Sequence, residues 1–129
     1  MIDQVCPCNP KNLYKNCCKP YHEGLKFAPT AETLMRSRYS AYVLKLKDYL
    51  IKTWHPSTCP QILDFEANLH WQRLEIISKS KGELFDDEAM VEFKACYKNS
   101  SADGFMHEKS SFKKSNNQWF YLSGLLDPK

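Results

Sequence analysis

The first periodic pattern along the chain lies in AETLMRSRYSAYVLKL, residues 31–46, and predicts an amphipathic helix. Thr30 stands where an N-cap is expected, and Glu32 would lie in the first turn, where a negative charge is favourable. Asp48 is expected to cap a second, short helix, YLIKTW, which ends before Pro56 because the residue preceding a proline avoids helical geometry. The apolar stripe of the first helix consists of Ala31, Met35, Tyr39, Tyr42 and Leu46.

The spacing of apolar positions changes from helical to alternating in the second half of the chain. The change follows a helical or irregular stretch, QILDFEANLH. WQRLEIISKS and EAMVEFKACYK alternate apolar and polar positions, as strands do. GFMHEKSSFKKS and QWFYLSGLL predict two more strands, joined by a turn at Asn116-Asn117. Helices followed by a run of strands predict an α+β fold, with helices packed on one face of a curved, mainly antiparallel sheet. In the second strand the residues expected to face one way are Ala89, Val91, Phe93, Ala95 and Tyr97.

Composition places the chain among ordinary globular proteins. Its 129 residues are 43% hydrophobic and 26% charged, which is enough to bury a core without disulfides. The net charge of +3 arises from interspersed acidic and basic residues, so nucleic acid is not an expected partner. No apolar run approaches the ~20 residues of a membrane-spanning helix. The start, MIDQVCPC, lacks the basic and apolar regions of a signal peptide, so a cytoplasmic location is expected.

The densest chemistry lies in CPCNPKNLYKNCC, which contains Cys6, Cys8, Cys17 and Cys18. In a reducing compartment, clustered cysteines are more often metal ligands or redox centres than structural disulfides. Four thiolates suit a tetrahedral structural zinc ion, and the lysines nearby would offset the negative charge of such a site. The expected turn is at Asn9-Pro10, and the following residues would form a helical turn that delivers the second cysteine pair.

Two alternatives to zinc are a pair of disulfides and a thiol–disulfide redox centre. Adjacent cysteines bridged to each other form a strained ring, and the chain has no Cys-x-x-Cys sequence. The pattern therefore favours one structural zinc ion, or another thiophilic divalent ion, per chain. His22 could replace a cysteine as ligand but is not needed, and the isolated Cys59 and Cys96 are expected to be ordinary thiols.

Cys-Pro-Cys, eight residues and Cys-Cys, with Tyr14 and Lys15 before the closing pair, resemble the SEC-C motif, the zinc-binding element at the end of the SecA translocase motor. The segments KPYHEG, APTAETLMRSRYSAYVL and YLIKTWHPST resemble the YchJ-like family of uncharacterised bacterial proteins. The similarity runs from Cys6 to about Ser57 and resumes more weakly at FMHEKSSF and QWFYLSGL. It implies a SEC-C motif at residues 1–24 joined to a nuclear-transport-factor-2-like (cystatin-like) cone at residues 25–129.

Two departures from the family pattern stand out. Where SEC-C motifs usually have Gly-Ser-Gly after the second cysteine, this chain has Asn9-Pro10-Lys11, so the turn must form without glycine. Some members carry a second SEC-C motif at the carboxyl end, whereas this sequence ends at LLDPK. A function that needs two zinc elements is therefore not expected.

A curved sheet covered by helices forms a cavity that suits a small ligand. Arg38 lies at the edge of the apolar helix face, where it needs a carboxylate, a ring face or a bound anion as partner. The favoured interpretation is a structural ion pair with Glu92 or Glu108. His107 and Glu108 are neighbours on a strand and point to opposite faces, one of them into the cavity. The aromatic and polar side chains proposed for the cavity are Arg38, Tyr42, Trp54, His55, Trp71, Glu92, His107, Glu108 and Trp119.

The sequence contains no recognisable catalytic motif, and a zinc ion with four thiolates has no open position for water. The expected function is therefore a protein-interaction module with structural zinc, since the SEC-C element of SecA-like proteins docks a chaperone or the ribosome. One alternative is a small-molecule enzyme or sensor in which Arg38 holds an anion and His55 or His107 acts as acid or base. Another is nucleic-acid binding through lysines and aromatic residues.

Overall fold

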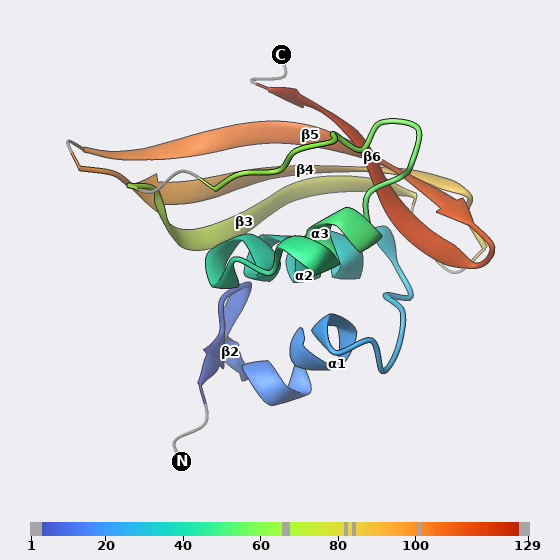
Figure 1. Ribbon diagram of the computed structural model, residues 1–129, viewed down its shortest axis with the longest axis horizontal. Coiled ribbons are helices and arrows are strands. Elements are labelled where there is room, and N and C mark those ends of the chain that lie inside the picture. The colour runs from blue at the N-terminus through green and yellow to red at the C-terminus, as the bar shows by residue number, and fades with distance from the viewer. Residues whose placement is uncertain (1–3, 66–67, 82, 84, 101, 127–129) are drawn as a thin grey trace.

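The computed structural model shows an α+β protein built in three layers (Figure 1). It describes residues 4–65, 68–81, 83, 85–100 and 102–126. An antiparallel sheet forms the first layer, and helices α2 (Ala31–Leu44) and α3 (Lys47–Lys52) lie beneath it. The N-terminal segment packs on the opposite side of α2, so this helix is the middle layer of the molecule.

The sheet contains four strands in sequence order, each antiparallel to its neighbours: β3 (His70–Lys81), β4 (Glu88–Lys98), β5 (Asp103–Ser115) and β6 (Gln118–Leu126). The alternation predicted for β4 is confirmed, because Ala89, Val91, Phe93 and Ala95 are all buried and Tyr97 is partly buried. The turn between β5 and β6 falls at Asn116 and Asn117, whose φ angles of 52° and 63° match the left-handed turn that hairpins favour. The described part of residues 61–69 is irregular.

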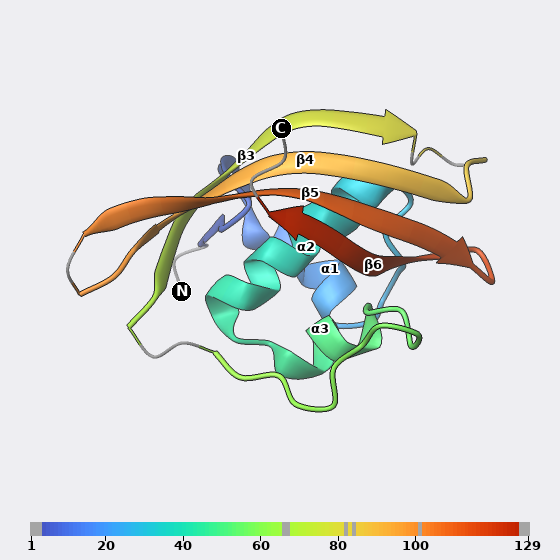
Figure 2. The ribbon, with the colours of Figure 1, turned by 90° about the horizontal axis from the view of Figure 1, so that it is seen from above.

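Helix α2 begins as predicted, with the Thr30 hydroxyl accepting a hydrogen bond from the Thr33 amide at 3.1 Å. It ends at Leu44, two residues earlier than the apolar stripe suggested, because Lys45 adopts a left-handed conformation. The expected cap on α3 is wrong: its N-cap is Leu46 without a side-chain hydrogen bond, and Asp48 lies in the first turn. Figure 2 shows α2 running obliquely beneath the strands, which lets its apolar face meet several of them.

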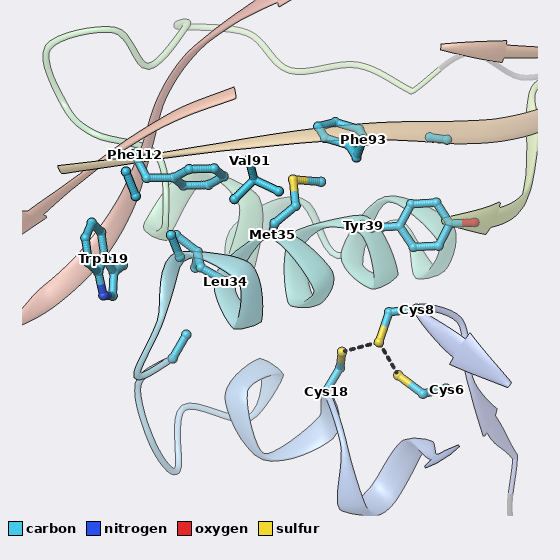
Figure 3. Packing of buried hydrophobic residues seen from close by; sticks show 14 residues of the cluster. Cys6, Cys8, Cys18, Leu34, Met35, Tyr39, Val91, Phe93, Phe112 and Trp119 are labelled. Atoms are coloured by element: carbon cyan, nitrogen blue, oxygen red, sulfur yellow. Dashed lines mark hydrogen bonds between the residues drawn. The ribbon is translucent and has the colours of Figure 1, made fainter. Parts of the chain in front are cut away.

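The face of α2 that meets the sheet forms the main core (Figure 3). Its buried side chains include Leu34, Met35 and Tyr39, which pack with Val91 and Phe93 of β4. Cys6, Cys8 and Cys18 belong to the same cluster of buried residues. The division expected between residues 24 and 25 therefore remains a prediction, since the two parts share a continuous core.

The N-terminal segment consists of β1 (Val5–Cys6), β2 (Asn9–Leu13), the 3-10 helix η1 (Tyr14–Asn16) and α1 (Lys19–His22). His22 links this segment to α2 through both nitrogens of its ring. Nε2 lies 2.8 Å from the Ser37 carbonyl oxygen of α2, and Nδ1 lies 2.7 Å from the Tyr14 hydroxyl. A carbonyl can only accept, so Nε2 carries the proton and Nδ1 of the neutral ring accepts from Tyr14. Burial lowers the pKa of His22 and favours this neutral form.

Arg38 joins α2 to α3 and β6. Its Nη1 donates to the Leu50 carbonyl oxygen at 2.8 Å and to the Thr53 hydroxyl at 2.7 Å. The guanidinium also stacks between the rings of Trp54 and Tyr121, 5.0 and 4.7 Å from their centroids. The ion pair expected with Glu92 or Glu108 is wrong, since Arg38 forms no ion pair with the residues that the structure describes. The negative end of α3 and two ring faces compensate the charge instead.

The contacts of Arg38 predict that Arg38→Lys destabilises the fold. A lysine keeps the charge but loses the planar group that stacks between two rings and bonds two acceptors at once. We expect the free energy of unfolding to fall by about 2–4 kcal/mol in urea titrations. Arg73→Lys is the matched control, because Arg73 is exposed on β3, and its effect should stay within about 0.5 kcal/mol. Equal effects of the two variants would contradict the role assigned to Arg38.

Candidate metal centre and cavity

Four cysteine sulfurs converge between the N-terminal hairpin and α2. The Sγ atoms of Cys6, Cys8, Cys17 and Cys18 all lie within 4.8 Å of one another. Cys6, Cys8 and Cys18 are almost fully buried, and Cys17 is half-buried. Figure 3 shows the first three with their sulfurs pointing toward one another below α2. The fold therefore brings together all four ligands that the sequence pattern predicts.

A short hairpin and two helical turns place these sulfurs. Val5 pairs with Leu13, and Cys6 with Asn9, so that Pro7 and Cys8 form the turn of the hairpin. The turn expected at Asn9-Pro10 is wrong, because these residues begin β2. The predicted helical turn is present as η1, and it brings Cys17 and Cys18 back to the hairpin. The chain can make this turn without glycine, since the departure from Gly-Ser-Gly falls in a strand.

The spacing of the sulfurs fits one tetrahedral ion. Cys8 Sγ lies 3.6 Å from Cys6 Sγ, 3.6 Å from Cys17 Sγ and 3.7 Å from Cys18 Sγ. With metal–sulfur bonds of about 2.3 Å, the edges of a tetrahedron measure about 3.8 Å. An S–S bond of about 2.05 Å is much shorter than any of these separations. The cluster can therefore hold a thiophilic metal ion with little rearrangement.

Helix α2 supplies a second layer of contacts around the cluster. The Ser40 hydroxyl, which is fully buried, lies 3.3 Å from Cys18 Sγ and 3.6 Å from Cys6 Sγ. Arg36 Nη1 donates to the Cys8 carbonyl oxygen at 3.2 Å. A hydroxyl beside a thiolate can donate to the sulfur and fix its orientation. Sequence reasoning missed Ser40, whose position on the polar side of the helix gives no signal of a partner 22 residues earlier.

The thiols of Cys6 and Cys18 differ in pKa, in opposite directions from the ordinary value. The neighbouring thiols of Cys18 and Cys8 lower the pKa of Cys6, whereas interactions with Cys6 and Cys8, together with burial, raise the pKa of Cys18. Several thiolates close together repel one another unless a cation lies among them. Binding of a divalent ion would therefore release protons from the cluster.

A cavity of about 190 Å³, here called the chamber, lies between α2 and the sheet. Four of the predicted cavity residues line it: Arg38, Tyr42, Trp71 and Glu108. Glu108, rather than His107, is thus the strand residue that faces inward. The remaining lining residues are Met35, Tyr39, Phe93, Ala95, Met106 and Tyr121. Strand alternation identifies Phe93 and Ala95, because they share a face with Val91.

The other predicted cavity residues lie elsewhere. Glu92 and His107 face the opposite side of the sheet, where His107 Nε2 and Glu92 Oε2 are 2.7 Å apart. His55 lies in the loop after α3, with its Nδ1 2.7 Å from the Ser57 hydroxyl. Trp54 covers Arg38 from outside the chamber lining, and Trp119 is buried beside a separate small void. The proposal of His55 or His107 as an acid or base in the cavity is therefore wrong.

No helix in the described part of the chain is long and apolar enough to cross a membrane.

Comparison with known proteins supports the same architecture. Residues 30–124 match the family model described as "YchJ, middle NTF2-like domain". A UPF0225 protein of Streptomyces coelicolor is 41% identical, over 92% of this chain and 93% of its own length. Another from Photorhabdus laumondii is 43% identical, over 96% and 82%.

Two solved structures are similar in fold. The solution structure of a SEC-C motif containing protein from Rhodopseudomonas palustris has a TM-score of 0.82 and 28% identity, covering 95% of this chain and 98% of its own. The crystal structure of a SEC-C motif containing protein from Psychrobacter arcticus has a TM-score of 0.77 and 36% identity, covering 98% and 84%. The chain belongs to the YchJ-like UPF0225 family, in which a SEC-C motif accompanies an NTF2-like domain.

Proposed function

We propose that the four cysteines bind one structural zinc ion and that the protein is a zinc-stabilised protein-interaction module. The observation that carries the first part is the convergence of four sulfurs within 4.8 Å, at separations that suit a tetrahedral ion. Four soft ligands favour zinc over the oxygen-seeking cations. The likeness to SEC-C proteins supports the same assignment.

The proposed site has no role in hydrolysis. An ion bound by Cys6, Cys8, Cys17 and Cys18 has four ligands, so no coordination position remains for water. The burial of three of the cysteines and the Ser40 contact also keep the ion away from solvent. The ion would instead hold the hairpin, η1 and α1 in one shape and present their outer surface.

The surface of residues 4–30, which includes the connector between α1 and α2, combines exposed apolar side chains with positive charge. Leu25 and Phe27 of the connector before α2 are 74% and 59% exposed, although apolar side chains of this size are usually buried. Residues 4–30 contain four lysines and a single glutamate. A partner segment that carries acidic residues and a large apolar side chain would complement this surface. These features support a protein partner for the N-terminal part of the molecule.

Metal analysis of the untagged protein tests the zinc proposal. We expect about one zinc ion per chain in the wild type and loss of most of it in Cys17→Ser, which removes one of four thiolates. Cys96→Ser is the control, because Cys96 lies on β4, far along the chain from the cluster, and its zinc content should match the wild type. A metal-free wild type in which all six thiols are titratable, or one with disulfides, would contradict the proposal.

The Ser40 contact predicts a selective effect on metal affinity. Ser40→Ala removes the hydroxyl beside Cys18, and we expect zinc affinity to fall about tenfold in a chelator competition assay. Ser37→Ala is the matched control on the same helix, since its hydroxyl bonds the Leu34 carbonyl and Tyr49 instead. Ser37→Ala should lower stability but leave zinc affinity unchanged. Unchanged affinity in Ser40→Ala would show that the hydroxyl does not support the site.

Variants of the connector test the partner proposal. Leu25→Ser combined with Phe27→Ser should abolish binding of a protein captured by the zinc-loaded wild type, because both apolar side chains would be lost from the interface. Phe105→Ser is the control, since Phe105 is similarly exposed, at 55%, but lies on β5. Calorimetry with the purified partner measures the difference. A partner that binds the double variant as tightly as the wild type does not use this surface.

A further inference from the structure

The chamber between α2 and the sheet contains a carboxylate held in a fixed position. Ser110 and Tyr121 both direct their hydroxyls at Glu108 Oε2, the latter from 3.5 Å. Gly124 on β6 leaves the space that this side chain occupies, because a Cβ there would overlap the Glu108 carboxylate. Three residues on two strands thus position Glu108 at the wall of a mostly aromatic cavity.

This carboxylate has capacity for a further hydrogen bond. Glu108 forms no ion pair with the described residues, and those residues donate no hydrogen bond to its Oε1 atom. A half-buried carboxylate without a cation beside it costs free energy in the empty fold. The cost is reduced when a donor inside the chamber reaches Oε1.

The charged side chains that line the chamber carry no net charge together. Arg38 supplies one positive charge and Glu108 one negative charge. Burial raises the pKa of Tyr42, while Arg38 lowers it and Glu108 raises it, so both charges act on the same hydroxyl. In this confined space, Glu108 would repel a bound anion and Arg38 would repel a bound cation. A neutral molecule avoids both repulsions.

The size and walls of the chamber indicate the shape of the occupant. Its volume of about 190 Å³ slightly exceeds the ~150 Å³ of an engineered apolar cavity that binds benzene. Tyr39, Tyr42, Trp71, Phe93 and Tyr121 provide flat aromatic surfaces, against which a planar ring packs well. An adjoining hollow of about 240 Å³ shares Tyr42 and Trp71 with the chamber and offers a route to it.

We propose that the chamber binds a neutral, single-ring organic molecule whose N–H or O–H group donates a hydrogen bond to Glu108. The aromatic walls and Met35 and Met106 contact the ring, and Glu108 selects for the donor. Arg38 keeps the site neutral overall while it holds α3 and β6 in place. This site is separate from the cysteine cluster, on the opposite side of α2.

Phenol and toluene test the proposal, because they have nearly the same shape but phenol alone has a donor. Each is titrated at pH 7 into the zinc-loaded protein, and the NMR signals of the Met35 and Met106 methyl groups report binding in the chamber. We expect phenol to shift both signals and to bind at least tenfold more tightly than benzoate or benzylamine, which are charged at this pH. The ratio of the toluene and phenol dissociation constants should fall about tenfold in Glu108→Gln, since a neutral acceptor bonds more weakly than a carboxylate.

Glu92→Gln is the matched control, because Glu92 lies on β4 but faces the opposite side of the sheet. This variant should leave the ratio of the toluene and phenol dissociation constants unchanged. Ala95→Leu is a second variant that fills the chamber from β4, and it should abolish the methyl shifts caused by every probe. An unchanged ratio in Glu108→Gln, tighter binding of benzoate or benzylamine than of phenol, or methyl shifts that persist in Ala95→Leu would each overturn the proposal.

Discussion

The structure depends on burial of α2 on two opposite sides. One side carries Leu34, Met35 and Tyr39 against the sheet, and the other meets the cysteine cluster through Ser40. A helix of 14 residues has little stability alone in water, so it needs the packing on both sides. The cysteine element and the sheet therefore stabilise each other through the helix that separates them.

Local patterns in the sequence predicted most of the fold. The alternation of β4, the Thr30 cap and the Asn116-Asn117 turn all follow from residues near one another in the chain. The four cysteines were found for the same reason, since one segment of 13 residues contains them. The turn within that segment was misplaced because proline and asparagine suit both a turn and the first residues of an edge strand.

Long-range contacts were harder to predict. The position of Arg38 at the edge of an apolar helix face favours a carboxylate partner over a ring face or an anion. Its observed partners are a carbonyl oxygen, a hydroxyl and two rings, all from segments that follow α2. Residue type alone favours a cavity position for His55 and His107, but neither lines the chamber. Strand parity leaves the choice between His107 and Glu108 open. The position of Glu108 in the chamber wall and the pairing of His107 with Glu92 on the outer face decide it.

The position of Ser40 beside Cys18 also bears on how the chain folds as it is made. The ribosome completes the cysteine segment and α2 before any strand of the sheet, since β3 begins at His70. Cys18 and Ser40 are 22 residues apart, so their contact closes a short loop, which forms far faster than the sheet. The nascent chain can thus cover one side of α2 early, while the side with Met35 and Tyr39 stays exposed until β4 and β5 emerge.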